Sequence, residues 1–207
     1  MSVDHAFADA IYEIREIEPR NSEVSKFMNL HHRVLDSLPA HGRHWVKRRL
    51  FSSVKNHLKT GHVGLGVYDA TGAMVGQVLL TFPDLEGGQN MKGYPIGHGA
   101  NQYAPNHCLV VQTLGVSPKH QGKGIRKMLL QKAEEIAHQK YRRHLLAKTD
   151  IANKGSVKGF IDAGYVASRE TFVAGEAYKC VFMYKPVALP GVAVTHSQKL
   201  HFGALKA

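Results

Sequence analysis

The chain has 207 residues, of which 43% are hydrophobic, and a formal net charge of +11. This length and apolar content suit one domain with a sizeable core. No apolar run approaches the roughly 20 residues of a membrane helix, and the segment from Met1 to His5 lacks the features of a signal peptide. We therefore expect a soluble, cytoplasmic protein without a membrane partner.

The first third of the chain predicts one strand and two helices. Residues 11–17 alternate apolar and polar as a strand does, and Ser22 is a candidate N-cap for a helix over residues 23–38. Apolar residues at helical spacing from Trp45 onward mark a second helix, which ends near Gly61. Both stripes are typical of helix faces that pack on a core. They comprise Val24, Phe27, Met28, Val34, Leu35 and Leu38, then Trp45, Val46, Leu50, Phe51, Val54 and Leu58.

The next stretch predicts a hairpin and a long irregular connection. Residues 63–68 and 74–82 indicate strands, and the turn from Asp69 to Gly72 joins them because glycine tolerates a positive φ. Residues 83–106 are rich in glycine, and a connection of this length is either a binding loop or a disordered segment. As a binding loop it favours a polar ligand through Asn90, Tyr94, His98, Asn101, Gln102, Tyr103 and His107.

The second half of the chain predicts four strands and two helices. An apolar strand over residues 110–116 leads through a glycine-bearing turn into a helix. A strand over 145–149 and a helix from Asn153 follow, and residues 165–173 and 178–184 indicate an antiparallel pair. The order β-α-α-β-β-β-α-β-α-β-β predicts an α+β fold with a mixed sheet.

The remaining organisation follows from a few residues. Residues 1–187 are expected to form one domain, followed by a tail over residues 188–207 that is long enough to add a small strand or contact a partner subunit. The sequence leaves a monomer and a homodimer open. Cys108 and Cys180 fall in two predicted apolar strands, which favours buried thiols over a disulfide.

The turn before the second-half helix has the features of an anion cradle. Gly122 and Gly124 allow the backbone to approach a ligand, and the unpaired N–H groups of the first helical turn face it. The spacing excludes a Walker loop, because Gly124 follows Lys123, and a dinucleotide fingerprint, because Lys127 occupies the third glycine position. The expected ligand carries phosphate, and the cations around the turn are Lys119, Lys123, Arg126 and Lys127.

Two blocks of sequence resemble the GNAT family of N-acetyltransferases. Gln121 to Arg126 resembles the family's acetyl-CoA loop, Gln/Arg-x-x-Gly-x-Gly/Ala, which follows a strand ending in Val-x-Pro, as it does here. Asn153 to Tyr165 is similar to the family's Asn-x-x-Ala-x-x-x-Tyr-x-x-x-Gly-Phe segment. Arg126 stands where the family has a small residue, and Phe160 replaces a tyrosine that in many members protonates the departing CoA thiolate.

The resemblance implies a fold, a donor and a binding site. The fold would be a mixed, splayed sheet of about seven strands flanked by about four helices. The activity would be transfer of an acetyl group from acetyl-CoA to the primary amine of a small molecule or peptide. The loop would grip the pyrophosphate, the strand before it would pair with pantetheine, and the second block would border the cofactor. The implied cofactor-binding residues are Leu114, Gly115, Val116, Gln121, Gly122, Lys123, Gly124, Ile125, Arg126, Asn153, Ser156 and Phe160.

Acetyl transfer to an amine needs a general base, and the sequence offers few. Many relatives place a glutamate on the strand before the cradle, but here that strand carries Gln112 and Thr113, neither of which is a base at neutral pH. His107, at the start of the strand, and Asp150, at the end of the next one, are the candidates. We expect His107 to serve, because the unperturbed pKa of histidine, about 6.5, suits the task. Phe160 has no proton to give, so the sequence does not identify the group that protonates the CoA thiolate.

Two other functions remain open on the sequence. The absence of a strand carboxylate, together with Phe160, fits a chain that binds CoA or acyl-CoA without turnover, as a sensor or interaction module. The positive charge fits an acetyltransferase that modifies an RNA-borne amine such as aminoacyl-tRNA. Nucleic acid is the less favoured partner, because residues 47–49 and 142–143 lack interleaved aromatics. No metal is expected, because the His31-His32 pair and the 41–44 segment have no Cys or Glu at ligand spacing.

Overall fold

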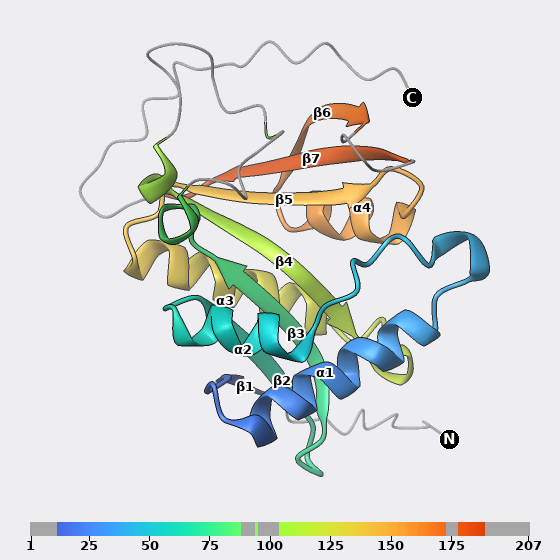
Figure 1. Cartoon of the computed structure of the whole chain (residues 1–207). Coiled ribbons are helices and arrows are strands. Elements are labelled where there is room, and N and C mark those ends of the chain that lie inside the picture. The colour runs from blue at the N-terminus through green and yellow to red at the C-terminus, as the bar shows by residue number, and fades with distance from the viewer. Residues whose placement is uncertain (1–11, 88–93, 95–103, 173–177, 189–207) are drawn as a thin grey trace, which may run out of the picture.

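The computed structural model describes residues 12–87, 94, 104–172 and 178–188. Within these residues one mixed sheet of seven strands has the order β1-β2-β3-β4-β5-β7-β6 (Figure 1). The predicted order of elements is confirmed. The strands are β1 (Glu13–Glu16), β2 (Val63–Tyr68), β3 (Met74–Thr81), β4 (Cys108–Val116), β5 (His144–Asp150), β6 (Val166–Phe172) and β7 (Lys179–Pro186).

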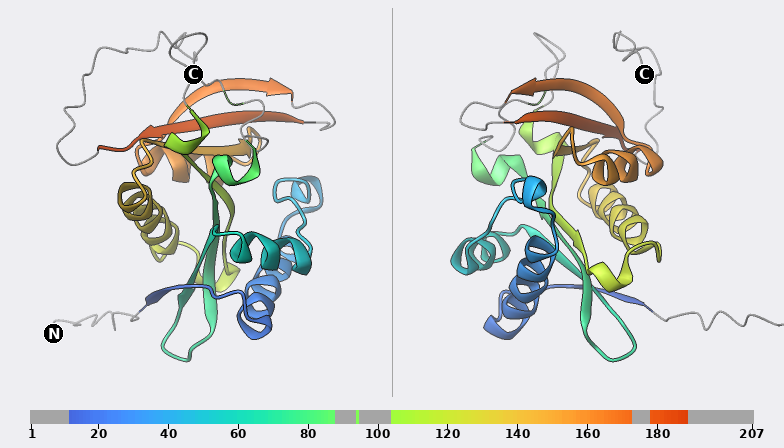
Figure 2. Two further views of the ribbon diagram at one scale, coloured as in Figure 1. Left: turned by 60° about the vertical axis from the view of Figure 1, so that its left-hand side comes forward. Right: turned by 90° about the vertical axis from the view of Figure 1, so that its right-hand side faces the viewer.

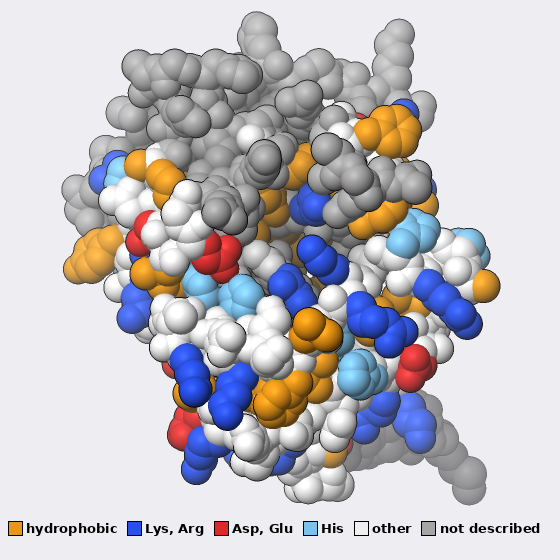
Figure 3. Space-filling model, in the orientation of Figure 1, with side chains coloured by type: hydrophobic (Ala, Val, Ile, Leu, Met, Phe, Trp, Pro, Cys, Tyr) orange, Lys and Arg blue, Asp and Glu red, His pale blue; other side chains and the backbone are white. Residues whose placement is uncertain are grey.

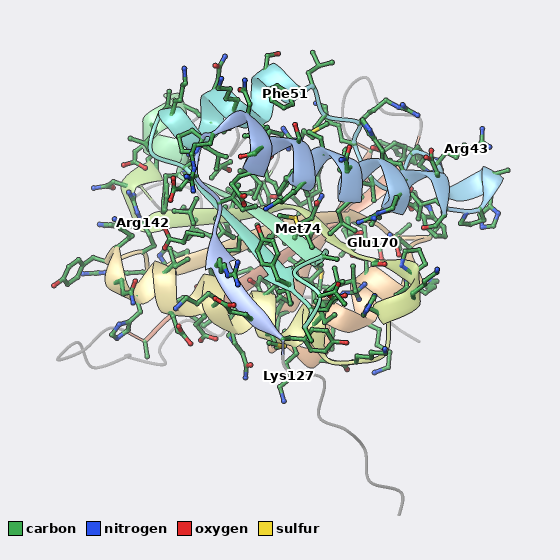
Figure 4. All side chains as sticks on the ribbon, turned by 90° about the horizontal axis from the view of Figure 1, so that it is seen from below. Arg43, Phe51, Met74, Lys127, Arg142 and Glu170 are labelled. Carbon is green, nitrogen blue, oxygen red and sulfur yellow. The ribbon has the colours of Figure 1, made fainter. Side chains whose placement is uncertain are left out.

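Four α-helices cover the two faces of the sheet, α1 and α2 on one and α3 and α4 on the other (Figure 2). Each pair of helices covers a separate apolar core. Residues of α1 and α2 pack against Tyr68, Met74 and Leu79. On the opposite face, α3 and Phe160 of α4 pack on the sheet. Figure 4 shows these layers, with Met74 between α1 and the strands. The helices are α1 (Asn21–Asp36), α2 (Phe51–Lys59), α3 (Ile125–Gln139) and α4 (Lys154–Asp162).

The first two helices differ from the prediction at their ends. Helix α1 begins at Asn21, so Ser22 lies inside it rather than capping it, and Leu38 lies beyond its last residue. Helix α2 begins at Phe51 instead of near Trp45. The predicted core positions Leu50 and Phe51 are 72% and 37% exposed, and Phe51 stands at the outer end of α2 in Figure 4.

The reason is that residues 37–50 form a connection held by tertiary contacts instead of a helix. After the 3-10 turn η1 (Ala40–Gly42), Trp45 packs so closely on Gly42 that a Cβ there would lie 2.8 Å from the indole ring. His44 and Arg49 then bond to residues of β5 and β4. These bonds hold the connection over the sheet. The spacing of apolar residues could not predict them, because it reports only local structure.

The feature that positions the site is the incomplete pairing of β4 with β5. The two strands are parallel and paired at only four positions, from Cys108 with His144 to Val111 with Ala147. Beyond that point β4 continues to Val116 and β5 to Asp150 without pairing with each other. On its other edge β4 pairs with β3, with an irregularity opposite the step from Gln77 to Leu79. One edge of β4, residues 112–116, is therefore left open beside β5.

The remaining predictions have mixed outcomes. Both cysteines are free and buried, as predicted. In the long connection the structure describes η2 (Pro83–Glu86), Tyr94 and η5 (Pro105–His107), so the expected roles of Asn90, His98 and residues 101–103 lie outside the described residues, as does the tail beyond residue 188. No described helix has both the length and the apolar character needed to span a bilayer.

Gly76 of β3 provides a test of how closely the start of α3 packs on the sheet. A Cβ on Gly76 would lie 2.4 Å from Cγ2 of Ile125, the first residue of α3. We expect Gly76→Ala to lower the free energy of unfolding by about 1–3 kcal/mol, because the helix start must move away from the sheet. Urea denaturation measures the change. The control is Gly155→Ala on α4, where the nearest atom to the added Cβ is 4.0 Å away; equal losses in both variants would contradict this packing account.

Candidate active site

A cleft of about 770 Å³ opens where β4 and β5 separate. Its walls come from the end of α1, the connection before α2, the open half of β4, the end of β5 and the start of α4. Its mouth lies on the face shown in Figure 3, where Lys and Arg side chains gather near the centre and Asp and Glu side chains are few.

Most of the predicted cofactor residues line this cleft. From β4 these are Leu114, Gly115 and Val116, and from the turn and α4 they are Gln121, Arg126, Asn153, Ser156 and Phe160. The four predicted residues outside the lining are Gly122, Lys123, Gly124 and Ile125.

These four residues form the turn that enters α3. Gly122 and Gly124 have φ of +77° and +78°, a conformation that favours glycine, and no atom lies within 4 Å of where their Cβ atoms would be. Gly124 is the N-cap of α3, so the first N–H groups of the helix follow it directly. Ile125 buries its side chain in the core, so its backbone alone can serve a ligand. Lys123 is exposed beside them.

Arg126, which departs from the family pattern, is accommodated by a glycine on the neighbouring helix. Its Nη1 donates to the carbonyl oxygen of Gly155, and a Cβ on Gly159 would lie only 2.1 Å from that nitrogen. Burial lowers the pKa of Arg126, and the carboxylate of Asp162 opposes that effect. The side chain therefore bridges the starts of α3 and α4 at the edge of the cleft, with Gly159 leaving it room.

The second sequence block forms the start of α4 and its packing. Asn153 caps the helix, its Oδ1 accepting from the backbone N–H of Ser156 at 3.1 Å. Phe160 is buried and meets Tyr165 edge to face, with ring centroids 5.1 Å apart. The hydroxyl of Tyr165 is also buried and has no hydrogen-bond partner among the described residues; burial raises the pKa of that group.

Sequence reasoning missed His44, which joins Asp150 across the cleft. The Nε2 of His44 lies 2.8 Å from Oδ2 of Asp150, and Oδ1 of Asp150 accepts from the N–H of Ala152 at 2.6 Å. The Asp150 side chain is 2% exposed, whereas that of His44 is 44% exposed and its ring leans on Tyr178. Because an ionised carboxylate only accepts, Nε2 carries a proton and Nδ1 of the neutral ring carries the lone pair. This arrangement suits proton abstraction at Nδ1.

Arg49, the second residue that was missed, reaches the irregular part of β4. Its Nε donates to Oγ1 of Thr113 at 3.1 Å, and its Nη2 donates to Oε1 of Gln112. The backbone N–H of Arg49 donates to Nε2 of His31, which is buried in α1. Burial lowers the pKa of Arg49, and the charge of Glu86 raises it. Only the tertiary structure brings these segments together, so no local signal marked Arg49.

Residues 37–165 match the model of the acetyltransferase (GNAT) family, and this span is more than half of the chain. The chain belongs to the GNAT acetyltransferase family. No curated protein sequence matches it significantly.

Solved structures share the GNAT fold at low sequence identity. The ribosomal-protein-S18-alanine N-acetyltransferase of Escherichia coli is 10% identical with a TM-score of 0.62, and the match covers 89% of this chain and 99% of that one. An N-acetyltransferase of Staphylococcus aureus Mu50 is 13% identical with a TM-score of 0.62, and the match covers 86% of this chain and 99% of that one. The yncA protein of Salmonella typhimurium, solved with its cofactor acetyl-CoA, is 14% identical with a TM-score of 0.61, and the match covers 90% of this chain and 99% of that one. At these identities the likeness shows the fold.

Of the two predicted catalytic residues, the structure brings only Asp150 into the GNAT cleft. Asp150 ends β5 and lines the cleft. His107 precedes Cys108, at the end of β4 where the strands are still paired, and it does not belong to the lining. His44, from the connection before α2, lies in the lining beside Asp150 instead.

A cluster of His57, His62 and Glu86 borders the cleft and is the one group among the described residues with the spacing for a metal ion. Each histidine Nε2 lies 3.1 Å from Oε1 of Glu86. However, the N–H of Phe82 donates to Nδ1 of His62 at 3.0 Å, so Nε2 of the neutral ring carries the proton and has no lone pair for a metal. This proton faces Oε1 of Glu86, a contact of 3.1 Å that brings residue 62, next to β2, close to η2.

The buried His31 predicts a loss of stability in acid. Burial lowers the pKa of His31 from 6.5 to about 4, reinforced by the charges of His32 and Arg49. Below pH 6.5 the unfolded chain therefore takes up a proton that the folded chain refuses until about pH 4, so stability present above 6.5 is lost as the pH falls through this window. The full effect is on the order of 3 kcal/mol.

Thermal unfolding between pH 7 and pH 5 measures this effect. We expect His31→Gln, which keeps an acceptor for the N–H of Arg49, to show a smaller fall in Tm than the wild-type protein. The matched control is His32→Gln, at the exposed neighbouring position, which should keep most of the fall because burial is the main cause of the His31 shift. An unchanged pH dependence in His31→Gln would refute the role of His31.

Proposed function

We propose that the chain is an acetyl-CoA-dependent N-acetyltransferase that acts on the primary amine of a small molecule or peptide. The observation that carries this proposal is the opening between β4 and β5, which leads from the turn of Gly122 and Gly124 into a cleft that holds a histidine and a carboxylate in hydrogen-bond contact. The family supports an acyltransferase activity, and the residues present fit acetyl-CoA.

The fit rests on two features of the backbone. The turn over residues 121–126 joins two left-handed glycines to the start of α3, which suits a pyrophosphate. The open edge of β4 from Gln112 to Val116 offers N–H and C=O groups that can pair with the amide-bearing pantetheine arm as an added strand does. At about 3.3 Å per residue this edge runs for roughly 13 Å away from the turn. The deep end of the cleft, at Gln112 and Thr113, is then where the chemistry takes place.

When bound, acetyl-CoA supplies an activated acyl carbonyl. His44 accepts the proton of the acceptor amine at Nδ1, while Asp150 holds the imidazole through Nε2 and stabilises the imidazolium that forms. Phe160 provides no acid at the cleft wall, so we propose that water protonates the departing thiolate. Residues 1–187 would form the catalytic domain.

The cradle is tested by the change Gly122→Glu, which places bulk and negative charge where the pyrophosphate should bind. Titration calorimetry with acetyl-CoA should give micromolar binding to the wild-type protein and a loss of about tenfold or more in the variant, which is at least ~1.4 kcal/mol.

The matched control for the cradle is Gly72→Glu, in the turn between β2 and β3. Gly72 has a φ of +78°, against +77° for Gly122, and the same open surroundings, so the backbone strain is alike. No binding to the folded wild-type protein, or equal losses in both variants, would contradict the cradle.

The base is tested by His44→Gln. With the best amine from a screen, kcat/KM should fall by about 10²- to 10⁴-fold while acetyl-CoA affinity is kept. His41→Gln, an exposed position on the same connection outside the cleft lining, is the control and should behave as wild type. Wild-type rates in His44→Gln would exclude this base, and acetyl-CoA binding without turnover of any amine would favour a CoA-binding sensor instead.

A further inference from the structure

Arg49 is a half-buried cation whose hydrogen bonds go to neutral side chains. Its guanidinium contacts the hydroxyl of Thr113 and the amide oxygen of Gln112, and no carboxylate among the described residues forms an ion pair with it. Burial lowers the pKa of Arg49 more than the charge of Glu86, which forms no ion pair with it, raises it, so the guanidinium is partly desolvated. A desolvated cation without an anion is unfavourable, and active sites accept that cost when a substrate supplies the anion.

The guanidinium is held in one orientation before any ligand arrives. The backbone N–H of Arg49 is bonded to His31, and two of its side-chain donors are fixed to β4. Thr113, one of those partners, has a φ of +51°, which is unusual for a residue other than glycine and marks the irregular step of β4. Holding the cation in place in this way lowers the entropy lost when an anion binds.

The donors that remain match a planar anion with two oxygens. Of the five guanidinium N–H groups, the bonds to Thr113 and Gln112 use one on Nε and one on Nη2. Three hydrogens remain, and two of them, one on Nη1 and the second on Nη2, lie side by side on the edge of the guanidinium opposite Nε. A carboxylate accepts two parallel bonds from such an edge.

The charges around the cleft also favour an anionic acceptor. The described cations in the lining are Lys47, Arg49, Arg126 and Lys148. Its described acids are Glu86, which lies beside His57 and His62, and Asp150, which is bonded to His44. An acceptor with several amines would need unpaired carboxylates, and the surface around the mouth instead shows a gathering of Lys and Arg (Figure 3).

We infer that the acceptor is an amine that also carries a carboxylate, as an amino acid does, and that Arg49 binds this carboxylate at the deep end of the cleft. The inference rests on the proposed acetyl transfer. Arg49 is thus the residue that determines acceptor specificity, His44 takes the proton from the amine, and the cradle at Gly122 holds the donor at the other end.

The test compares pairs of acceptors that differ only in charge. L-alanine, L-methionine and L-phenylalanine are each assayed beside their carboxamides, together with 1,4-diaminobutane and phosphoethanolamine, by release of the CoA thiol. We expect the wild-type protein to prefer the acids by about tenfold to a hundredfold in kcat/KM, the range of a charged hydrogen bond. Because the carboxamides have the less basic amines, reactivity alone would favour them. Equal rates within pairs, or a preference for the diamine or the phosphate, would overturn the inference.

Variants separate the role of Arg49 from general charge. Arg49→Gln should raise the KM for the acids far more than the KM for the carboxamides, so that the preference within each pair disappears. Arg49→Lys keeps the positive charge but lacks the two parallel N–H donors of a guanidinium, so it should retain part of the preference. Arg48→Gln, at the exposed neighbouring position outside the cleft lining, should retain all of it. A preference that survives Arg49→Gln would contradict the assignment.

A second measurement keeps this inference distinct from the proposed function. Titration calorimetry of each acid and its carboxamide against the complex with CoA reports acceptor binding without turnover, and circular dichroism with the Tm establishes that each variant folds. Tighter binding of the acids that is lost in Arg49→Gln supports the inference even if no amine is acetylated, which would count against the proposed function alone. Equal binding of acids and carboxamides overturns the inference while acetyl transfer stands.

Discussion

The site depends on where the parallel pairing of β4 and β5 stops. Four paired positions hold the strands together, and the apolar cores on the two faces secure them. Beyond Val111 and Ala147 the strands separate, which leaves Gln112 to Val116 without a paired strand on that edge among the described residues. An unsatisfied strand edge inside a protein favours an added strand or an extended ligand. The cleft, the turn at its mouth and the polar groups at its deep end are all arranged around this opening.

The connection between α1 and α2 converts that opening into a candidate reaction site. It is irregular because its polar side chains bond across the sheet: His44 with Asp150 at the end of β5, and Arg49 with Thr113 on β4. One short segment therefore reaches both walls of the cleft. The backbone of Arg49 is in turn fixed by the buried His31 of α1, so the first apolar core also supports the site.

The order of the elements could be predicted from the sequence, because its signals are local. The turn with Gly122 and Gly124 and the helix start near Asn153 also depend on neighbouring residues, and both are present in the fold. The acceptor side depends on contacts such as His44 with Asp150, which are 106 positions apart, and no periodicity reports such a pair. The same limit explains the choice of His107: its residue type suits a base, but the register of β4 and β5 puts it at the paired end. Gly159, whose missing side chain accommodates Arg126, is likewise evident only in three dimensions.

The central claim is that the open edge of β4 and the turn before α3 form one binding surface for acetyl-CoA. Amide hydrogen exchange with and without acetyl-CoA tests it most directly, because it reports each backbone N–H. The account predicts slower exchange at residues 112–116 and 122–127 on binding, with little change in the paired segment of residues 108–111. Protection confined to other segments, or none while acetyl-CoA is bound, would contradict the account.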